Sequence, residues 1–179
     1  MIKRLLSFGA AALATLVGGC GDGPSTVAGG YRSPATWSSF VYATSPGPLL
    51  LEVVGDPFGA GSGTLGRTIA ATMAAAIPAR PFTLTTETAA APRSNFRVVL
   101  VLGGDPSLDE RAICAGRGKA EAAKIEAGGR VDLIATFCDG EALLSSVRGW
   151  VAKIDGADDR RFHRLLGQVA RELMGESIP

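Results

Sequence analysis

The sequence predicts one α/β (α+β) domain in which a single mixed β-sheet carries two helices. The prediction rests on three observations. Residues 49–55 and 95–103 form apolar runs of strand length, and residues 64–77 and 158–174 place apolar side chains at helical spacing. The pair Asp139-Gly140, a strong signal for a two-residue hairpin turn, stands between two further strand patterns. The expected element order is β-α-β-β-(β)-β-β-α.

The first half of the domain is predicted as a strand, a loop, a helix and a second strand. The run at 49–55 is followed by a glycine-dense loop at 56–63, and the helix begins at Thr64. Its apolar residues recur every four positions: Leu65, Ile69, Met73 and Ile77. Pro78 ends the helix, and residues 82–87 are predicted as the second strand.

The middle of the chain contains the strand expected at the centre of the sheet. Residues 95–103 are apolar at successive positions, which predicts burial on both faces. Residues 107–118 form an excursion that carries Cys114. The segment 119–127 is ambiguous, because Ala-Glu-Ala-Ala-Lys favours a helix whereas the hairpin that follows favours a strand. We assign this segment as a strand.

The last part of the chain predicts a hairpin and a closing helix. Residues 130–137 alternate, and their inward side chains are Val131, Leu133, Ala135 and Phe137. The Asp139-Gly140 turn leads into a partner strand at 141–154. The helix at 158–174 begins with acidic residues and is followed by Gly175 as a C-cap. Its apolar stripe, expected to cover one face of the sheet, is Phe162, Leu165, Leu166, Val169 and Leu173.

The first twenty residues are organised like an export signal. Lys3 and Arg4 precede an apolar run at 5–17, which is shorter than the roughly 17 to 25 residues of a membrane-spanning helix. The closing residues Val17-Gly18-Gly19-Cys20 resemble the lipobox of bacterial lipoproteins. The resemblance implies a signal peptide at 1–19, cleavage before Cys20, and acyl chains on Cys20 that anchor the protein in a membrane. An ordinary signal peptide that contains a cysteine is the alternative.

The residues between this signal and the domain have the composition of a linker. Gly, Ser, Thr, Pro and Ala dominate residues 20–48, which predicts a lipidated N-terminus and a tether, with the single folded domain at 49–179. Thr36–Thr44 contains aromatic residues that either dock on the domain as an irregular or edge strand or meet a partner. With 18 basic and 17 acidic side chains, the chain is near neutral, which argues against nucleic-acid binding.

The cysteines predict one disulfide. If Cys20 is acylated, Cys114 and Cys138 are the only pair left in an exported protein. Their bridge would close a loop of about 25 residues, contribute about 3 kcal/mol, and pin the excursion onto the hairpin tip. Two unrelated buried thiols are the alternative. Because His163 is the only histidine, no metal site is expected. No cofactor is expected either.

The glycine-rich loop is the one motif that suggests a ligand. Gly61, Gly63 and Gly66 fit the spacing of a dinucleotide-binding loop, and the same stretch fits a P-loop in which Arg67 replaces the lysine. Backbone amides at such a helix start can surround a phosphate. The missing lysine and a compartment without a nucleotide pool argue against a nucleotide. We therefore predict a connecting loop, with an anion or small-ligand site at Gly59–Gly66 as the alternative.

No catalytic residue set is predicted. His163 lies among arginines of the closing helix and is interpreted as part of a solvated face, and the chain lacks a G-x-S-x-G motif. Asp155, Asp158 and Asp159 lack the glycine and distal glutamate of a calcium-binding loop. We interpret these aspartates as a turn and a helix N-cap.

The order of elements from 49 to 174 is similar to that of small envelope proteins. It resembles the curli-secretion lipoprotein, the N-terminal domain of the translocation protein TolB, and lipoprotein activators of penicillin-binding proteins. The resemblance implies a non-catalytic assembly or accessory role, in which the domain binds or positions another envelope component. By the sorting convention of lipoprotein families, Gly21 after the cysteine favours the outer membrane.

Overall fold

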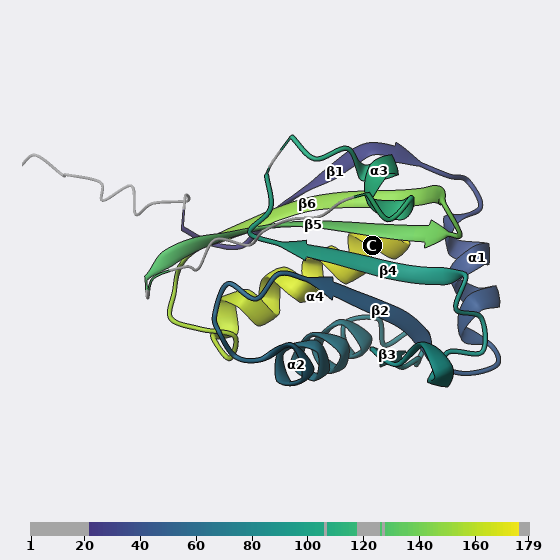
Figure 1. The fold of residues 1–179 in the computed structure, drawn as a ribbon, viewed down its shortest axis with the longest axis horizontal. Coiled ribbons are helices and arrows are strands. Elements are labelled where there is room, and N and C mark those ends of the chain that lie inside the picture. Colours follow the sequence, from purple (N-terminus) through teal and green to yellow (C-terminus); the bar gives the residue numbers. More distant parts are fainter. Residues whose placement is uncertain (1–21, 106, 118–125, 127, 176–179) are drawn as a thin grey trace, which may run out of the picture.

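The computed structural model describes residues 22–105, 107–117, 126 and 128–175. These residues form one six-stranded sheet in the order β1-β6-β5-β4-β2-β3 (Figure 1). The strands are β1 (Ser25–Arg32), β2 (Leu49–Val54), β3 (Leu84–Thr85), β4 (Phe96–Leu102), β5 (Gly129–Asp139) and β6 (Ala142–Ile154). The helices are α1 (Thr36–Thr44), α2 (Ser62–Ala75), α3 (Glu110–Cys114) and α4 (Arg160–Met174), with a 3-10 turn at Thr88–Ala90.

The sheet is mixed, as predicted. β2 runs parallel to both β3 and β4, whereas the pairs β4–β5, β5–β6 and β1–β6 are antiparallel. β4 lies inside the sheet between β2 and β5, and its apolar residues are buried on both faces. This confirms the central position expected for 95–103, because a strand with two buried faces needs neighbours on both edges and cover on both sides.

Two helices cover one face of the sheet and a shorter one lies on the other (Figure 1). α2 and α4 pack with Val98, Leu100 and Phe137 into the main core. A smaller core on the opposite face joins α3 to alternate residues of β4 and β5, among them Val99 and Ile134. The predicted pair of helices on a mixed sheet is therefore confirmed, and α1 and α3 are additional.

The hairpin and the closing helix form where the sequence predicts them. Gly140 follows Asp139 at the turn between β5 and β6 and has a φ of 55°. The side chain of Asp159 caps α4 by accepting a hydrogen bond from the backbone N–H of Arg161. Gly175 ends the helix in the left-handed conformation, with a φ of 78°.

The predicted tether is the main correction to the fold. Ser25–Arg32 is strand β1, which pairs with the outer edge of β6, and Thr36–Thr44 is a helix rather than an irregular or edge strand. The helix forms because Phe40 and Ala43, three positions apart, share one face and are both buried. Much of the predicted tether at 20–48 is thus part of the domain.

Two smaller differences concern the second strand and the segment before the hairpin. The strand expected at 82–87 is reduced to Leu84–Thr85, and the chain then turns into the short 3-10 helix. The strand assigned to 119–127 lies outside the described residues, apart from Glu126.

Candidate functional site

The glycine-rich loop between β2 and α2 surrounds a negative charge that belongs to the chain itself. The carboxylate of Asp56 accepts hydrogen bonds from the backbone N–H groups of Phe58 (3.3 Å), Ala60 (3.2 Å) and Gly61 (2.8 Å). These amides are the donors that a phosphate would use at the start of a helix. In this fold they hold the loop closed around an aspartate.

The four predicted ligand residues lie in or next to this loop, and most have a structural role there. Gly61 precedes α2 with a φ of 85°, a conformation that favours glycine. Gly66 packs against Thr86, the residue after β3, since a Cβ at position 66 would lie 2.8 Å from the Thr86 methyl carbon. Arg67 donates to the Thr64 hydroxyl (3.3 Å). Gly63 lines a shallow hollow between the start of α2, β2 and Thr86.

Removing the Asp56 carboxylate is expected to destabilise the start of α2. Asp56→Ala leaves three amides without their acceptor, so the free energy of unfolding should fall by about 1–2 kcal/mol. Asp56→Asn, which keeps one carbonyl oxygen, should lose less. Urea denaturation measures the change, and Asp155→Ala, at an exposed aspartate, is the matched control. An effect of Asp56→Ala no larger than the control would contradict this role.

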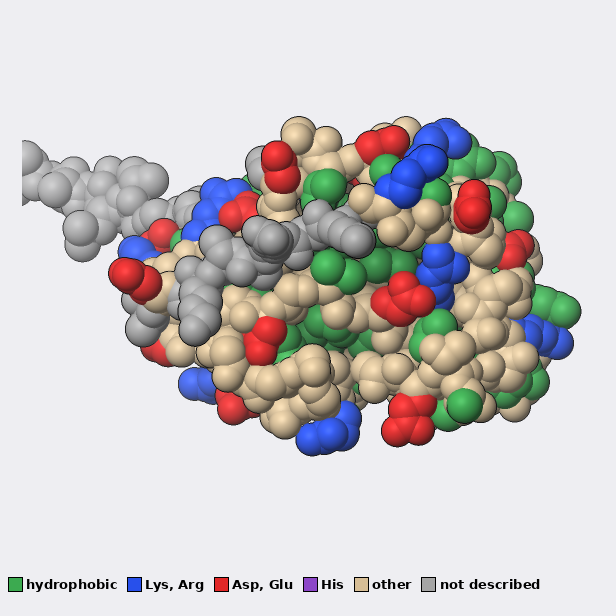
Figure 2. Space-filling model, viewed as in Figure 1, with side chains coloured by type: hydrophobic (Ala, Val, Ile, Leu, Met, Phe, Trp, Pro, Cys, Tyr) green, Lys and Arg blue, Asp and Glu red, His purple; other side chains and the backbone are tan. Residues whose placement is uncertain are grey.

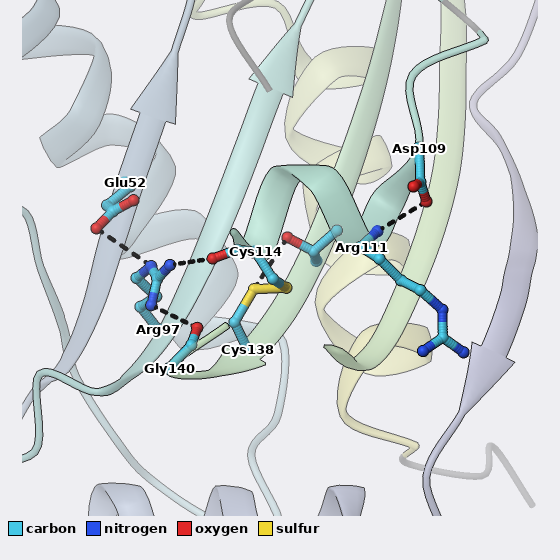
Figure 3. The surroundings of a disulfide bond; sticks show 8 residues. Glu52, Arg97, Asp109, Arg111, Cys114, Cys138 and Gly140 are labelled. Atoms are coloured by element: carbon cyan, nitrogen blue, oxygen red, sulfur yellow. Dashed lines mark hydrogen bonds and ion pairs between the residues drawn. A yellow bond between two sulfur atoms is a disulfide. The ribbon is translucent and has the colours of Figure 1, made fainter. Parts of the chain in front are cut away.

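The disulfide on the opposite face is the centre of a second, more elaborate arrangement. Cys114, at the end of α3, is bonded to Cys138 of β5, in agreement with the predicted pairing. Arg97 of β4 reaches the same place and donates to the carbonyl oxygens of Cys114 (2.6 Å) and Gly140 (2.9 Å) (Figure 3). Its Nε lies 3.4 Å from Oε1 of Glu52 without an aligned hydrogen bond. Arg97 therefore connects α3, the hairpin tip and β2.

A second arginine holds the other end of α3. Arg148 of β6 contacts Oε1 of Glu110 through Nε (2.9 Å) and Nη2 (2.6 Å), and Nη2 also donates to the Leu108 carbonyl oxygen (2.8 Å). Asp109 caps the helix by accepting from the Arg111 N–H (3.0 Å). A helix of one turn is not stable alone, so these contacts and the disulfide fix its position. Figure 2 shows this face, where acidic and basic groups border apolar side chains over β4.

A small groove lies on the same face, where β5 begins and β6 ends. It has a volume of about 290 Å³ and is lined by Arg130, Asp132, Arg148 and Trp150, together with neighbouring backbone. Arg130 forms an ion pair with Asp132 (2.6 Å), and its guanidinium lies 5.2 Å from the centre of the Trp150 ring. The hydrogen bond to Asp132 raises the pKa of Arg130, so this arginine stays charged.

Exposed apolar side chains lie along β1 and α1. In the part of the chain that the structure describes, the large apolar residues with high exposure are Val27 (51%), Tyr31 (40%), Trp37 (38%) and Tyr42 (54%). We call these four residues the β1–α1 surface. β1 lies along one edge of the sheet and α1 stands at the end of the strands (Figure 1). The sequence signal for this surface is the aromatic content of residues 31–42. The overall composition of 20–48 nevertheless led to the prediction of a tether.

The histidine and the aspartates of the α4 region have local structural roles. Nε2 of His163 lies 3.1 Å from the Ala157 carbonyl oxygen. The pKa of Asp159 is lowered by hydrogen bonds from the Arg161 backbone and side chain, as expected for an N-cap carboxylate. Across the described residues, no group of three or more His, Cys, Asp or Glu side chains could hold a metal ion. None of the described helices is long and apolar enough to span a membrane.

Comparisons with known proteins leave the family open. No family model and no curated protein matches the chain. Several chains of solved structures are similar in fold. One of them is a PelC dodecamer from Paraburkholderia phytofirmans, 11% identical, with a TM-score of 0.44 over 84% of this chain and 98% of the other.

Proposed function

We propose that the protein is a lipid-anchored, non-catalytic component of a bacterial cell envelope whose α/β domain binds or positions another envelope protein. The lipobox-like residues before Cys20 support the anchor. The disulfide between Cys114 and Cys138 supports an oxidising compartment such as the periplasm, where such bonds persist. Gly21 supports sorting to the outer membrane over the inner one.

The observation that carries this proposal is the β1–α1 surface. Large exposed aromatic side chains are typical of binding sites, because they bury much area at little entropic cost. Here the rings are already held in place. Tyr42 lies under the guanidinium of Arg93 at 3.4 Å, and Trp37 packs on Phe40 at 5.4 Å. The cost of ordering them on binding is therefore small.

The position of β1 adds a backbone contribution to the same surface. β1 is an outer strand of the sheet, paired with β6 along one edge only. An outer strand offers N–H and C=O groups that a partner can pair with. A partner protein with an extended segment and apolar side chains would fit both features.

Site-specific crosslinking in living cells tests this proposal. A photoreactive amino acid at position 27, 31, 37 or 42 is expected to capture the same envelope protein. Ala71 and Glu87, both exposed and outside this surface, are the matched control positions and should capture little of it. Equal yields from the control and test positions would contradict the β1–α1 surface. An unmodified Cys20 in the mass spectrum of the N-terminal peptide would contradict the anchor.

A further inference from the structure

The first described residue of the chain is tied to the end of the sheet. The Asp22 carboxylate forms an ion pair with the amino group of Lys153, and the Asp22 carbonyl oxygen accepts from the Ala152 N–H at 3.4 Å. Cys20 lies only two positions before Asp22. Two peptide units span at most about 7 Å between Cα atoms. An anchor at Cys20 is therefore held within about 7 Å of this point, whereas a free tether of the predicted length would reach many times farther.

The backbone is unusual at Lys153, the residue that pairs with Asp22. Val151 pairs with Val131 and Ile154 with Gly129, so β6 has one extra residue there and forms a bulge. Lys153 takes the left-handed conformation, with a φ of 56°, and no other described residue except glycine has a positive φ. A non-glycine residue is strained in this conformation. The strain is retained at the residue that binds Asp22.

We infer that the Asp22–Lys153 pair seats the domain directly on the bilayer, with the beginning of β1 and the end of β6 against the lipid headgroups. This inference rests on the proposed acylation of Cys20. Arg130 lies at the same end, in the strand that pairs with β6. The Arg130 and Lys153 side chains are 54% and 65% exposed, and they lie at this end while paired with Asp132 and Asp22, so each presents its exposed side to the headgroups.

The seating also gives the β1–α1 surface a direction. β1 has eight residues, so its far end lies about 23 Å from its start at 3.3 Å per residue. Val27 lies nearest the bilayer, whereas Trp37 and Tyr42 follow the far end of the strand. The partner protein would then contact the β1–α1 surface along a line that leads away from the membrane.

The two tryptophans of the chain provide a direct test, because they lie near opposite ends of β1. Trp150 pairs with Ser25 at the start of β1, and Trp37 follows its end. The acylated protein, cleaved before Cys20, is reconstituted into phosphatidylcholine–phosphatidylglycerol vesicles that contain a headgroup spin-labelled lipid. The Trp37→Phe variant reports on Trp150, and the Trp150→Phe variant reports on Trp37. Trp150 fluorescence should be quenched about threefold more than that of Trp37, given the ~23 Å length of β1. Equal quenching in protein that floats with the vesicles would overturn the inference.

A second variant tests the ion pair itself. In the Trp37→Phe background, Lys153→Gly removes the amino group and relieves the backbone strain, so the fold should be retained. Asp22 is then held only by the 3.4 Å hydrogen bond from the Ala152 N–H. We expect the quenching of Trp150 to fall about twofold, because whenever that bond opens the link to the first sheet residue, Ser25, spans up to about 17 Å. Lys153→Arg should keep the quenching. Unchanged quenching of Trp150 in Lys153→Gly would contradict the role of the Asp22–Lys153 pair in seating the domain. Flotation with the vesicles and the mass of the Cys20 peptide report on the acyl anchor alone. A missing anchor can therefore be distinguished from an anchored domain that is not seated on the bilayer.

Discussion

Replacing both Cys114 and Cys138 by alanine is expected to lower the free energy of unfolding by about 3 kcal/mol. The bond joins residues 24 positions apart, and its loss allows the unfolded chain many more conformations. Alanine is preferred to serine, because both sites are fully buried and a hydroxyl there would lack partners. Urea denaturation of the wild type and the variant measures the difference.

Reduction of the wild type is the matched control for this prediction. A reducing agent should bring the wild-type midpoint close to that of the double variant and leave the variant unchanged. If the wild type were insensitive to reduction, Cys114 and Cys138 would be free thiols in the protein as produced. Comparing protein exported to the periplasm with protein retained in the cytoplasm would then show whether the compartment decides the bond.

The parts of the fold that the sequence predicts well are those with strong periodicity. β2, β4, α2, α4 and the β5–β6 hairpin are all found near their expected bounds. Their apolar residues follow a strand or helix repeat over several turns or pleats, and Asp139-Gly140 marks the hairpin turn. In these elements local preference and tertiary burial agree, so the sequence pattern is sufficient.

β1 could not be predicted because its stability comes from elsewhere in the chain. Its sequence, Ser-Thr-Val-Ala-Gly-Gly-Tyr-Arg, has the composition of a linker and no apolar repeat. The strand forms because β6 offers an unpaired edge to it. Gly29 lies so close to Ser146 that a Cβ would be 1.8 Å from the serine hydroxyl oxygen. A glycine read as a sign of flexibility is therefore needed for close packing.

The candidate sites show the same limit. The spacing of Gly61, Gly63 and Gly66 correctly places a loop before a helix. It cannot reveal that the backbone N–H groups of this loop already donate hydrogen bonds to the Asp56 carboxylate. The arginine contacts of the α3 face did leave a signal. Arg97 stands between Phe96 and Val98 in a strand that is otherwise apolar, and a charge in such a strand requires partners. The partners of Arg97 depend on the position of α3, the helix that carries Cys114, and no local sequence pattern predicts this helix.

Arg97→Ala is expected to lower the free energy of unfolding by about 3 kcal/mol, because two charge-assisted hydrogen bonds are lost together. The side chain is only 16% exposed, so the carbonyl oxygens of Cys114 and Gly140 would be left poorly solvated. Arg130→Ala is the matched control. Its side chain is 54% exposed and pairs with Asp132 at the surface, so the loss should be below about 1 kcal/mol. Comparable losses would contradict the structural role of Arg97.

A double-mutant cycle separates the contribution of Arg97 from that of the disulfide. Both hold the end of α3, one through the Cys114 carbonyl oxygen and the other through its sulfur. Once the disulfide is absent, α3 can leave the sheet, and the hydrogen bond from Arg97 to the Cys114 carbonyl oxygen is lost with it. Arg97→Ala then removes only the hydrogen bond to Gly140. We therefore expect the combined variant to lose at least about 0.5 kcal/mol less than the sum of the separate losses. Additive losses would mean that Arg97 and the disulfide stabilise different parts of the fold, and that α3 stays in place without its covalent bond.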